Sequence, residues 1–363
     1  MLSPLSWLRG QLWNTLVSPT ISSFWIVLDN LDVVGSFLAN TGPISRSLNG
    51  LGYSPRWPRR VFPTSGFELV PDSDILEEEM FEHFHAGDYY PVRIGDVYKN
   101  GQYQVVGKLG FGVSSTAWLA ADRMEHRYVT LKIFARGEAG AWEAAVADHI
   151  KDSEKEGFGR DSIRKVLDEF ELPRDYGDNY CLVQEPLDLK ADHIMQLVTD
   201  PSDFTKFVSA EFENPTPRKF VYGHPVYKSR RFGNLELWGI GKLCDFGHVI
   251  PGEAPVYKMA QPDCYRAPEI LLRAPWGYPI DIWNLALLAW HLIQGEPLFK
   301  GRELDPETDY VFHTDRCHLA EIVEVLGPPP PEVLEQGAAS DTFFDKYGKL
   351  TCGEFQDSFL TTD

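Results

Sequence analysis

The sequence predicts an α+β chain built from two lobes, a small antiparallel sheet with one helix followed by a larger, mainly helical part. Two patterns predict this class. From Tyr89 to about Leu187, short strand-like runs surround a helical segment near residues 142–150. From Asp188 to about Leu326 the pattern is mainly helical. With 363 residues, 43% of them hydrophobic, the chain can bury a core in each lobe.

Changes in composition divide the chain into five segments. The first residues are rich in Ser, Pro and Gly without periodicity, and we expect them to be poorly ordered. An acidic stretch follows, which favours a solvated linker over a binding surface. The helical run DIWNLALLAWHLIQG is apolar on nearly every face, which is typical of a helix at the centre of a lobe. The predicted segments are an N-terminal extension (1–65), an acidic linker and lead-in (66–102), the small lobe with the connection after it (103–187), the larger lobe (188–331), which four prolines end, and a polar tail (332–363).

Acidic residues outnumber basic ones, and the formal net charge is −19. Such a surface repels phosphate backbones, so we expect no direct contact with nucleic acid and a basic peptide or protein as partner. The most apolar stretch, Ser23–Ala39, carries Asp29 and Asp32 and is not expected to span a membrane. The five cysteines form no CxxC pair, which predicts reduced thiols, and we expect a monomer in the cytoplasm and nucleus. A mitochondrial presequence is the alternative for the extension, although Arg9 is the only base before Asp29.

The first motif is a glycine-containing hairpin in LGFGVSSTAW. Gly110 and Gly112 lie between two strand-like runs. Glycines at a hairpin tip let backbone amides approach a polyphosphate that side chains would block. Two glycines are also found in plain turns, and that alternative stays open.

The second motif is a lysine inside an apolar strand. Lys132 ends the run Val-Thr-Leu-Lys, and a buried ammonium needs an anion because burying it unpaired is very costly. Glu143 offers one from an apolar helical face, whereas the competing Glu138 and Glu154 lack such a face. The alternative is a lysine whose stem packs while its ammonium reaches water.

Four further patterns follow in order. Asp188 begins DLKADHIM, and Asp245 ends an apolar strand in LCDFG, where its carboxylate could hold a divalent metal against phosphate oxygens. YRAPE and DIW come next. Each pattern is ordinary alone. Together they occur in one order, each in the secondary structure expected of a protein kinase.

On these residues the sequence resembles the eukaryotic protein kinase family, and specifically the serine/arginine-protein kinases in their fungal form. YYPVRIGDVYKNGQYQVVGKLGFGVSSTAWLAAD, DCYRAPEILL and GYPIDIWNLALLAWHLIQGEPLF carry the closer match, within roughly Val61 to Gly327. The resemblance implies a bilobal kinase fold, with ATP and Mg²⁺ as cofactors. It also implies transfer of the ATP γ-phosphate to serine of basic, Arg/Ser-rich proteins, which a negative surface would steer.

The resemblance also implies roles on the ATP side of the site. Leu109, Gly110 and Gly112 would cover the phosphates. Lys132 would hold the α- and β-phosphates, and Glu143 would orient Lys132. The hinge that meets the adenine would comprise Glu185, Pro186 and Leu187.

The catalytic residues implied by the resemblance lie further along the chain. Asp188 would accept or orient the proton of the attacking hydroxyl, and Lys190 would contact the transferred phosphate. Asp245 would bind Mg²⁺. The second metal position of the family, an asparagine, is His193 here, and imidazole is a poor ligand for Mg²⁺. Two residues expected to hold the larger lobe together are Glu269 and Asp281.

The largest departure from the family is a missing segment. CLVQEPL runs straight into DLKADHIM, where the family has two helices and the lead-in of the catalytic loop. We expect an exposed apolar face on the helix Ile280–Gln294 and an Asp188 tethered to the hinge strand. The resemblance then implies a kinase with impaired activity, and the alternative is a catalytically dead pseudokinase that acts as a binding scaffold. A metal-dependent hydrolase built on His83 and His85 is disfavoured because no further ligand follows at metal-site spacing.

Overall fold

The structure is a computed structural model, and it divides the chain into two compact units. One unit ends at Val249 and the other begins at Ile250. The sequence predicted a boundary after Leu187. In the structure, residues 188–249 belong instead to the unit that contains the main sheet. Most of the predicted N-terminal extension lies outside the described residues. The described residues are 56–152, 161–191, 194–233, 239, 241–250, 256–306 and 308–351.

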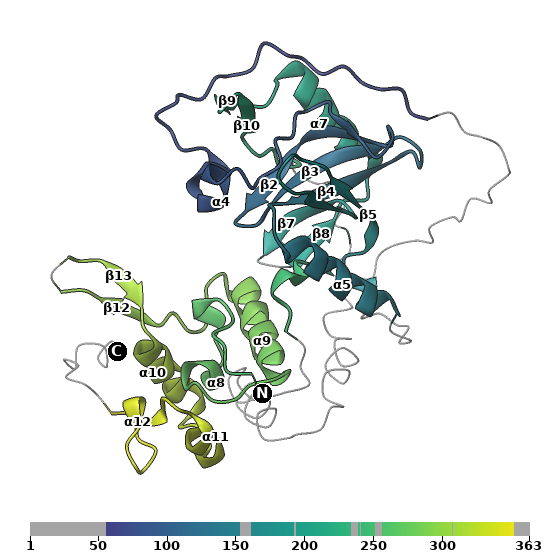
Figure 1. The fold of residues 1–363 in the computed structure, drawn as a ribbon. Coiled ribbons are helices and arrows are strands. Elements are labelled where there is room, and N and C mark those ends of the chain that lie inside the picture. The colour runs from purple at the N-terminus through teal and green to yellow at the C-terminus, as the bar shows by residue number, and fades with distance from the viewer. Residues whose placement is uncertain are drawn as a thin grey trace. The chain divides into compact units, whose positions relative to one another are not determined.

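The main sheet has six antiparallel strands in the order β1-β2-β3-β4-β6-β5, and one long helix, α5, follows β4 (Figure 1). This is the small sheet with one helix that the sequence predicted. Its strands are rich in β-branched and aromatic residues, which favour a pleated surface. The bounds are β1 (Val97–Tyr98), β2 (Tyr103–Gly112), β3 (Ser115–Asp122), β4 (Arg127–Phe134), α5 (Ala139–Asp152), β5 (Val166–Leu172) and β6 (Asn179–Gln184).

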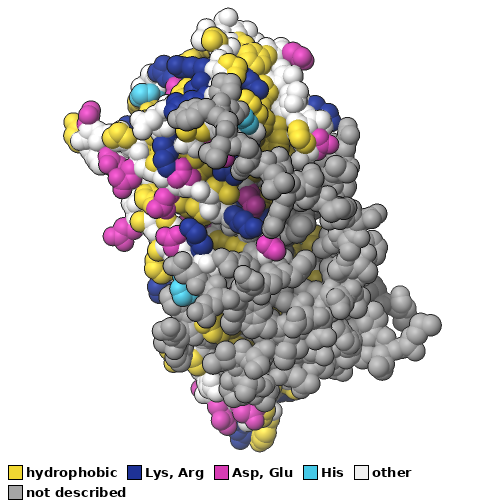
Figure 2. Space-filling model, turned by 90° about the vertical axis from the view of Figure 1, so that its right-hand side faces the viewer, with side chains coloured by type: hydrophobic (Ala, Val, Ile, Leu, Met, Phe, Trp, Pro, Cys, Tyr) yellow, Lys and Arg dark blue, Asp and Glu magenta, His cyan; other side chains and the backbone are white. Residues whose placement is uncertain are grey.

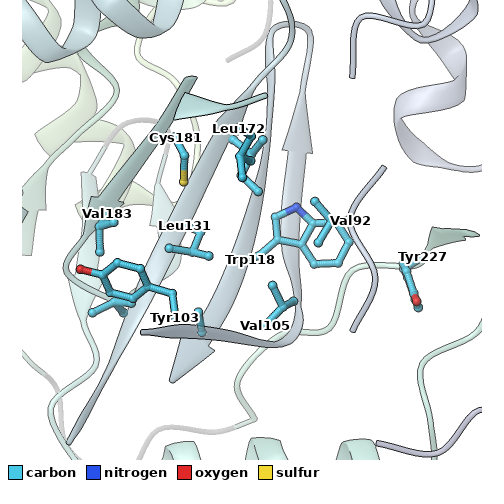
Figure 3. Close-up of a cluster of buried hydrophobic side chains, with 12 residues drawn as sticks. Val92, Tyr103, Val105, Trp118, Leu131, Leu172, Cys181, Val183 and Tyr227 are labelled. Carbon is cyan, nitrogen blue, oxygen red and sulfur yellow. The ribbon is translucent and has the colours of Figure 1, made fainter. Parts of the chain in front are cut away.

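Both faces of this sheet are covered by packed side chains. Val105 and Trp118 belong to the cluster shown in Figure 3, which also takes in Tyr227. Their neighbours Val106 and Leu119 belong to a second cluster. Because successive side chains of a strand point to opposite faces, the two clusters lie on the two sides of the sheet. Parts of the chain far from these strands therefore complete the core.

One of these parts is the stretch after the DLKADHIM motif, to which the sequence analysis gave no role. Helix α7 contributes Phe204 and Phe207 to the second cluster. Its contact with β2 is so close that a Cβ on Gly107 would lie 2.7 Å from the Phe207 ring. A separate three-stranded sheet has the order β11-β8-β7. The bounds are β7 (Leu187–Ala191), β8 (Ile194–Leu197), α7 (Pro201–Glu213), β9 (Arg218–Val221), β10 (His224–Tyr227) and β11 (Gly241–Leu243), followed by the 3₁₀ turn η2 (Phe246–His248).

The acidic stretch is not the solvated linker that its composition favoured. It forms the 3₁₀ turn η1 (Glu77–Met80) and the short helix α4 (Glu82–His85). Glu78 and Glu79 are only 6% and 8% exposed. The composition was misleading because their cationic partners lie on distant strands: Lys108 on β2 for Glu78, and Lys219 on β9 for Glu79.

The unit that begins at Ile250 is mainly helical, as predicted for the larger lobe. Its longest helix, α9, ends at Gly295, whose φ of 81° suits glycine. α9 buries Trp283 and Leu287 but leaves Leu292 and Ile293 exposed, which agrees with the exposed apolar face that the sequence predicted for this helix. No helix within the described residues is long and apolar enough to cross a membrane. The bounds are η3 (Asp263–Tyr265), α8 (Pro268–Leu271), α9 (Pro279–Gln294), β12 (Arg302–Leu304), β13 (Val311–His313), α10 (Asp315–Leu326), α11 (Pro331–Gln336) and α12 (Ser340–Phe343).

Candidate functional site

A lysine and two carboxylates meet beside the main sheet. The Lys132 Nζ lies 2.6 Å from the Glu143 Oε2 and 3.1 Å from the Asp245 Oδ1. The predicted ion pair between Lys132 and Glu143 is therefore present. The side chain of Glu143 is 2% exposed and that of Lys132 14%, whereas that of Asp245 is 46% exposed. The group is thus sealed on the helix side and open to solvent at Asp245.

Three separate elements bring these side chains together. Lys132 stands near the end of β4, and Glu143 lies early in α5, so the Glu143 carboxylate can reach across to the strand. Gln184 supports the pair from β6, because its Nε2 donates to the Glu143 Oε1 at 3.3 Å. Asp245 follows β11 in the left-handed conformation, with φ 66° and ψ 68°, which aspartate tolerates better than most residues. This turn redirects the chain at the point where the carboxylate meets Lys132.

The charges of this group suit a cation held together with phosphate. One ammonium stands against two carboxylates, and the solvent-exposed Asp245 oxygens are ligands that hard cations such as Mg²⁺ prefer. Within the described residues, no three His, Cys, Asp or Glu side chains are grouped to hold a metal by themselves. Mg²⁺ is commonly bound by one or two carboxylates plus substrate phosphates, so this donor set fits it. Burial raises the pKa of the neighbouring Cys244 thiol to about 11, so no thiolate competes there at neutral pH.

The glycine-containing hairpin shares its register with Lys132. Gly110 on β2 pairs with Ala117 on β3, and Ala117 pairs with Lys132 on β4. Gly110 and Lys132 therefore lie in one row, about 10 Å apart at two strand spacings. A Cβ on Gly110 would meet no atom within 4 Å, so the backbone after Leu109 is accessible. At the hairpin tip, Val113 is 59% exposed.

The predicted hinge contacts Arg164, a residue that no sequence motif indicates. The Glu185 carbonyl accepts hydrogen bonds from the Arg164 Nε at 3.0 Å and Nη2 at 2.8 Å. Its carboxylate lies 3.5 Å from the Lys242 Nζ. Leu187 is buried and begins β7. No local pattern marks Arg164, because its partner stands 21 positions further along the chain.

Asp188 lies apart from the Lys132 group. It stands in β7 and pairs with Gln196, which in turn pairs with Gly241 on β11. Asp245 comes four positions after Gly241 along the chain. Asp188 and Asp245 are therefore separated by two strand spacings across the sheet and by four further residues along the chain. The backbone of Lys190 is also in β7. Its side chain and the whole of His193 lie outside the described residues.

The two acids expected to hold the larger lobe together lie in the other unit. Glu269, in α8, is 9% exposed, and its Oε2 has no hydrogen-bond partner within the described part of the chain. Burial raises the pKa of the Glu269 carboxyl to about 7. Burial also raises the pKa of Asp281. Among the described residues, neither carboxyl has a cation partner like the one that Glu143 has.

Comparison with known proteins agrees with the kinase resemblance. No protein-family model matches the chain. A serine/threonine protein kinase of Aspergillus fumigatus is 34% identical over 327 residues, which cover 80% of this chain and 81% of the relative. The serine/threonine-protein kinase SRPK of Physarum polycephalum is 27% identical over 346 residues, covering 76% of this chain and 78% of the relative. SRSF protein kinase 3 of Mus musculus is 36% identical over 142 residues, covering 34% of this chain and 25% of the relative.

The first of these alignments also contains gaps in this chain. Its 327 positions exceed 80% of a 363-residue chain, so it includes positions that the relative has and this chain lacks. The sheet with one helix, the Lys132–Glu143 ion pair and the helical unit agree with what these relatives imply. This chain belongs to the serine/threonine protein kinase family.

Proposed function

We propose that this chain binds Mg-ATP beside its main sheet and transfers the γ-phosphate, at a reduced rate, to serine in Arg/Ser-rich proteins. The observation that carries the proposal is the position of the Lys132 ammonium, 2.6 Å from Glu143 and 3.1 Å from Asp245, in one row with Gly110. An ammonium that two carboxylates fix beside an open glycine hairpin suits a polyphosphate.

In this proposal each residue of the group has a separate task. Lys132 holds the α- and β-phosphates, and Glu143 keeps the ammonium pointed at them. The Gly110 backbone covers the phosphates from the side of the β2–β3 hairpin. Asp245 and the phosphates would hold Mg²⁺, which supplies neutralisation of the phosphate charge when bound. The adenine would meet the hinge at Glu185 and Leu187, and the Glu185 carbonyl would have to exchange its hydrogen bonds from Arg164 for one from the adenine.

The proposed substrate rests on charge and on the relatives. The formal net charge of −19 attracts basic peptides and raises their association rate. On the face in Figure 2 the acidic and basic side chains are interspersed, so this steering comes from the overall excess of acid. Two relatives carry names of SR-protein kinases, SRPK and SRSF protein kinase 3. We propose that the chain acts on such substrates in the cytoplasm and nucleus.

The reduced rate in the proposal rests on Asp188. Its pairing with Gln196 holds it in a hairpin, two strands away from β11 and the Asp245 that follows. A misplacement of about 1 Å can cost on the order of a hundredfold in rate. The second candidate function is a catalytically dead kinase-like scaffold. The position of Asp188 in the hairpin of β7 and β8 favours it. So does Arg164, because its guanidinium already occupies the Glu185 carbonyl of the hinge.

Nucleotide binding is tested by a thermal shift. A ligand that binds only the folded state raises the unfolding midpoint, and 100-fold saturation corresponds to about 2.7 kcal/mol. We expect Mg-ATP to raise the midpoint of the natural chain and not that of Lys132→Met. Lys346→Met, an exposed lysine in the other unit, is the matched control and keeps the shift. A folded natural chain with no shift would contradict nucleotide binding.

Phosphate transfer is tested with an Arg-Ser repeat peptide, using an Arg-Ala peptide as the control. We expect slow incorporation into the serine peptide alone. Turnover of about 1–100 per second, the usual range for kinases, would contradict the reduced rate. A thermal shift without incorporation would favour the scaffold.

A further inference from the structure

The residues ahead of the sheet contact the tip of the glycine hairpin directly. The Tyr89 hydroxyl lies 2.6 Å from the Gly112 carbonyl oxygen and 2.7 Å from that of Val113, and it donates to them. Tyr89 is 8% exposed. These two carbonyls belong to the hairpin proposed to cover the nucleotide phosphates. We call residues 74–90 the lead-in strap.

The strap also holds the base of the same hairpin. Lys108 stands on β2, two positions before Gly110, and its side chain is fully buried. Its ammonium lies 2.8 Å from the Glu77 Oε2, pairs with Glu78, and donates to the Tyr227 carbonyl at 3.0 Å. The strap therefore contacts the hairpin at two points, one at its base and one at its tip.

The strap is itself fixed next to Tyr89. The Asp88 carbonyl accepts a hydrogen bond from the Arg136 backbone N–H at 3.0 Å and another from the Asn179 Nδ2 at 2.8 Å. The Asp88 carboxylate forms an ion pair with the Arg136 Nη2 at 2.7 Å. Arg136 and Asn179 follow β4 and begin β6, so the sheet holds the strap just before the tyrosine. Tyr89 can thus restrain the tip without moving along with it.

Restraint at this place has a definite physical effect. A glycine-containing tip has many backbone conformations, and a ligand that orders it loses affinity to that ordering. A tip that the protein has already ordered costs the ligand less. Only ligands that reach the tip gain affinity in this way, and these are the ligands that carry phosphates.

We propose that Tyr89 is a positioning residue that orders the glycine hairpin for the polyphosphate of the nucleotide. The inference rests on the proposed function, because it concerns the same site. Tyr89 touches no substrate and acts through the Gly112 and Val113 carbonyls. Its hydroxyl therefore matters for ATP and is indifferent to adenosine, which has no phosphate to place beneath the hairpin.

The test compares two ligands and two tyrosines. Tyr89→Phe removes the hydroxyl and keeps the ring. We expect it to weaken Mg-ATP binding about fivefold, the value of one typical hydrogen bond, and to leave adenosine binding within twofold. Tyr90→Phe is the matched control, because Tyr90 packs on Tyr98 and the sheet core, and we expect both affinities to be retained.

A second measurement needs no nucleotide. Amide hydrogen exchange over residues 108–115 reports the order of the hairpin, and we expect it to quicken in Tyr89→Phe and not in Tyr90→Phe. Mg-ATP binding that is not weakened in Tyr89→Phe would overturn the inference, as would equal weakening of ATP and adenosine binding. A natural chain that binds no ATP would instead overturn the proposed function. In that case the exchange measurement still decides whether Tyr89 orders the hairpin.

Discussion

Two lysines of the same sheet, Lys108 and Lys132, have similar partners and different surroundings. Each ammonium contacts two carboxylates. The Lys108 side chain is fully buried and its acids are at most 12% exposed, whereas Asp245, beside Lys132, is 46% exposed. A sealed cluster of charges can serve only the fold, because no ligand can reach it. An open cluster leaves one carboxylate available to a ligand, and this difference separates a structural lysine from a functional one.

The largest expected effect is the loss of stability in Lys108→Met. This change leaves Glu77 and Glu78 buried without their cation, and breaking a buried pair on one side costs about 3–5 kcal/mol. Chemical denaturation measures the change in the free energy of unfolding. A loss below about 1 kcal/mol would show that the cluster does not hold the fold.

Lys132→Met is the matched variant for this measurement. Its loss of stability should be about 1–2 kcal/mol, because Asp245 remains in contact with water and only Glu143 is left buried. Equal losses in the two variants would erase the distinction between a sealed and an open cluster.

A buried carboxyl with no cation beside it in the described part of the chain offers a third comparison, and its effect on stability depends on pH. Glu269 has a folded-state pKa of about 7 against 4.5 for the ordinary group. Below about pH 4.5 it is protonated in both states. Between pH 4.5 and 7 the unfolded chain releases this proton first, so stability falls as the pH rises, by on the order of 3 kcal/mol. Glu269→Gln should flatten this slope between pH 4.5 and 7, and a variant with the same pH profile as the natural chain would contradict the assignment.

A further comparison separates two glycines of β2. Gly107→Ala brings a Cβ to 2.7 Å from the Phe207 ring and should cost about 1–3 kcal/mol of stability. Gly110→Ala meets no atom within 4 Å, so its unfolding midpoint should stay unchanged while Mg-ATP binding weakens. Thermal unfolding with and without Mg-ATP measures both. A destabilised Gly110→Ala with normal nucleotide binding would reverse the roles of the two positions.

The parts of the fold and site that the sequence predicted are those with local signals. The strand runs and the apolar helix α9 have clear periodicities, and Lys132 and Glu143 are only 11 positions apart. A lysine in an apolar strand needs an anion, and this holds for Lys108 as well, but no anion was predicted for it. Glu78 stands 30 positions before it, in a stretch whose composition favoured exposure.

Other features depend on contacts that no local pattern records. The sequence predicted only that Asp188 would be tethered to the hinge strand. The structure adds that Asp188 lies in the hairpin of β7 and β8. Arg164 and Glu185 meet across 21 positions. The packing of α7 against β2 requires Gly107 and Phe207 to face each other, and they stand 100 positions apart.

The burial of Lys108 by the lead-in strap has a practical consequence for where this lobe begins. A shortened polypeptide that started at residue 91 would keep every strand of the main sheet and would lose both acids that neutralise this ammonium. It would carry an uncompensated positive charge within an apolar wall, and aggregation would be its expected fate. The residues ahead of the first strand are therefore as much a part of the interior as the strands are.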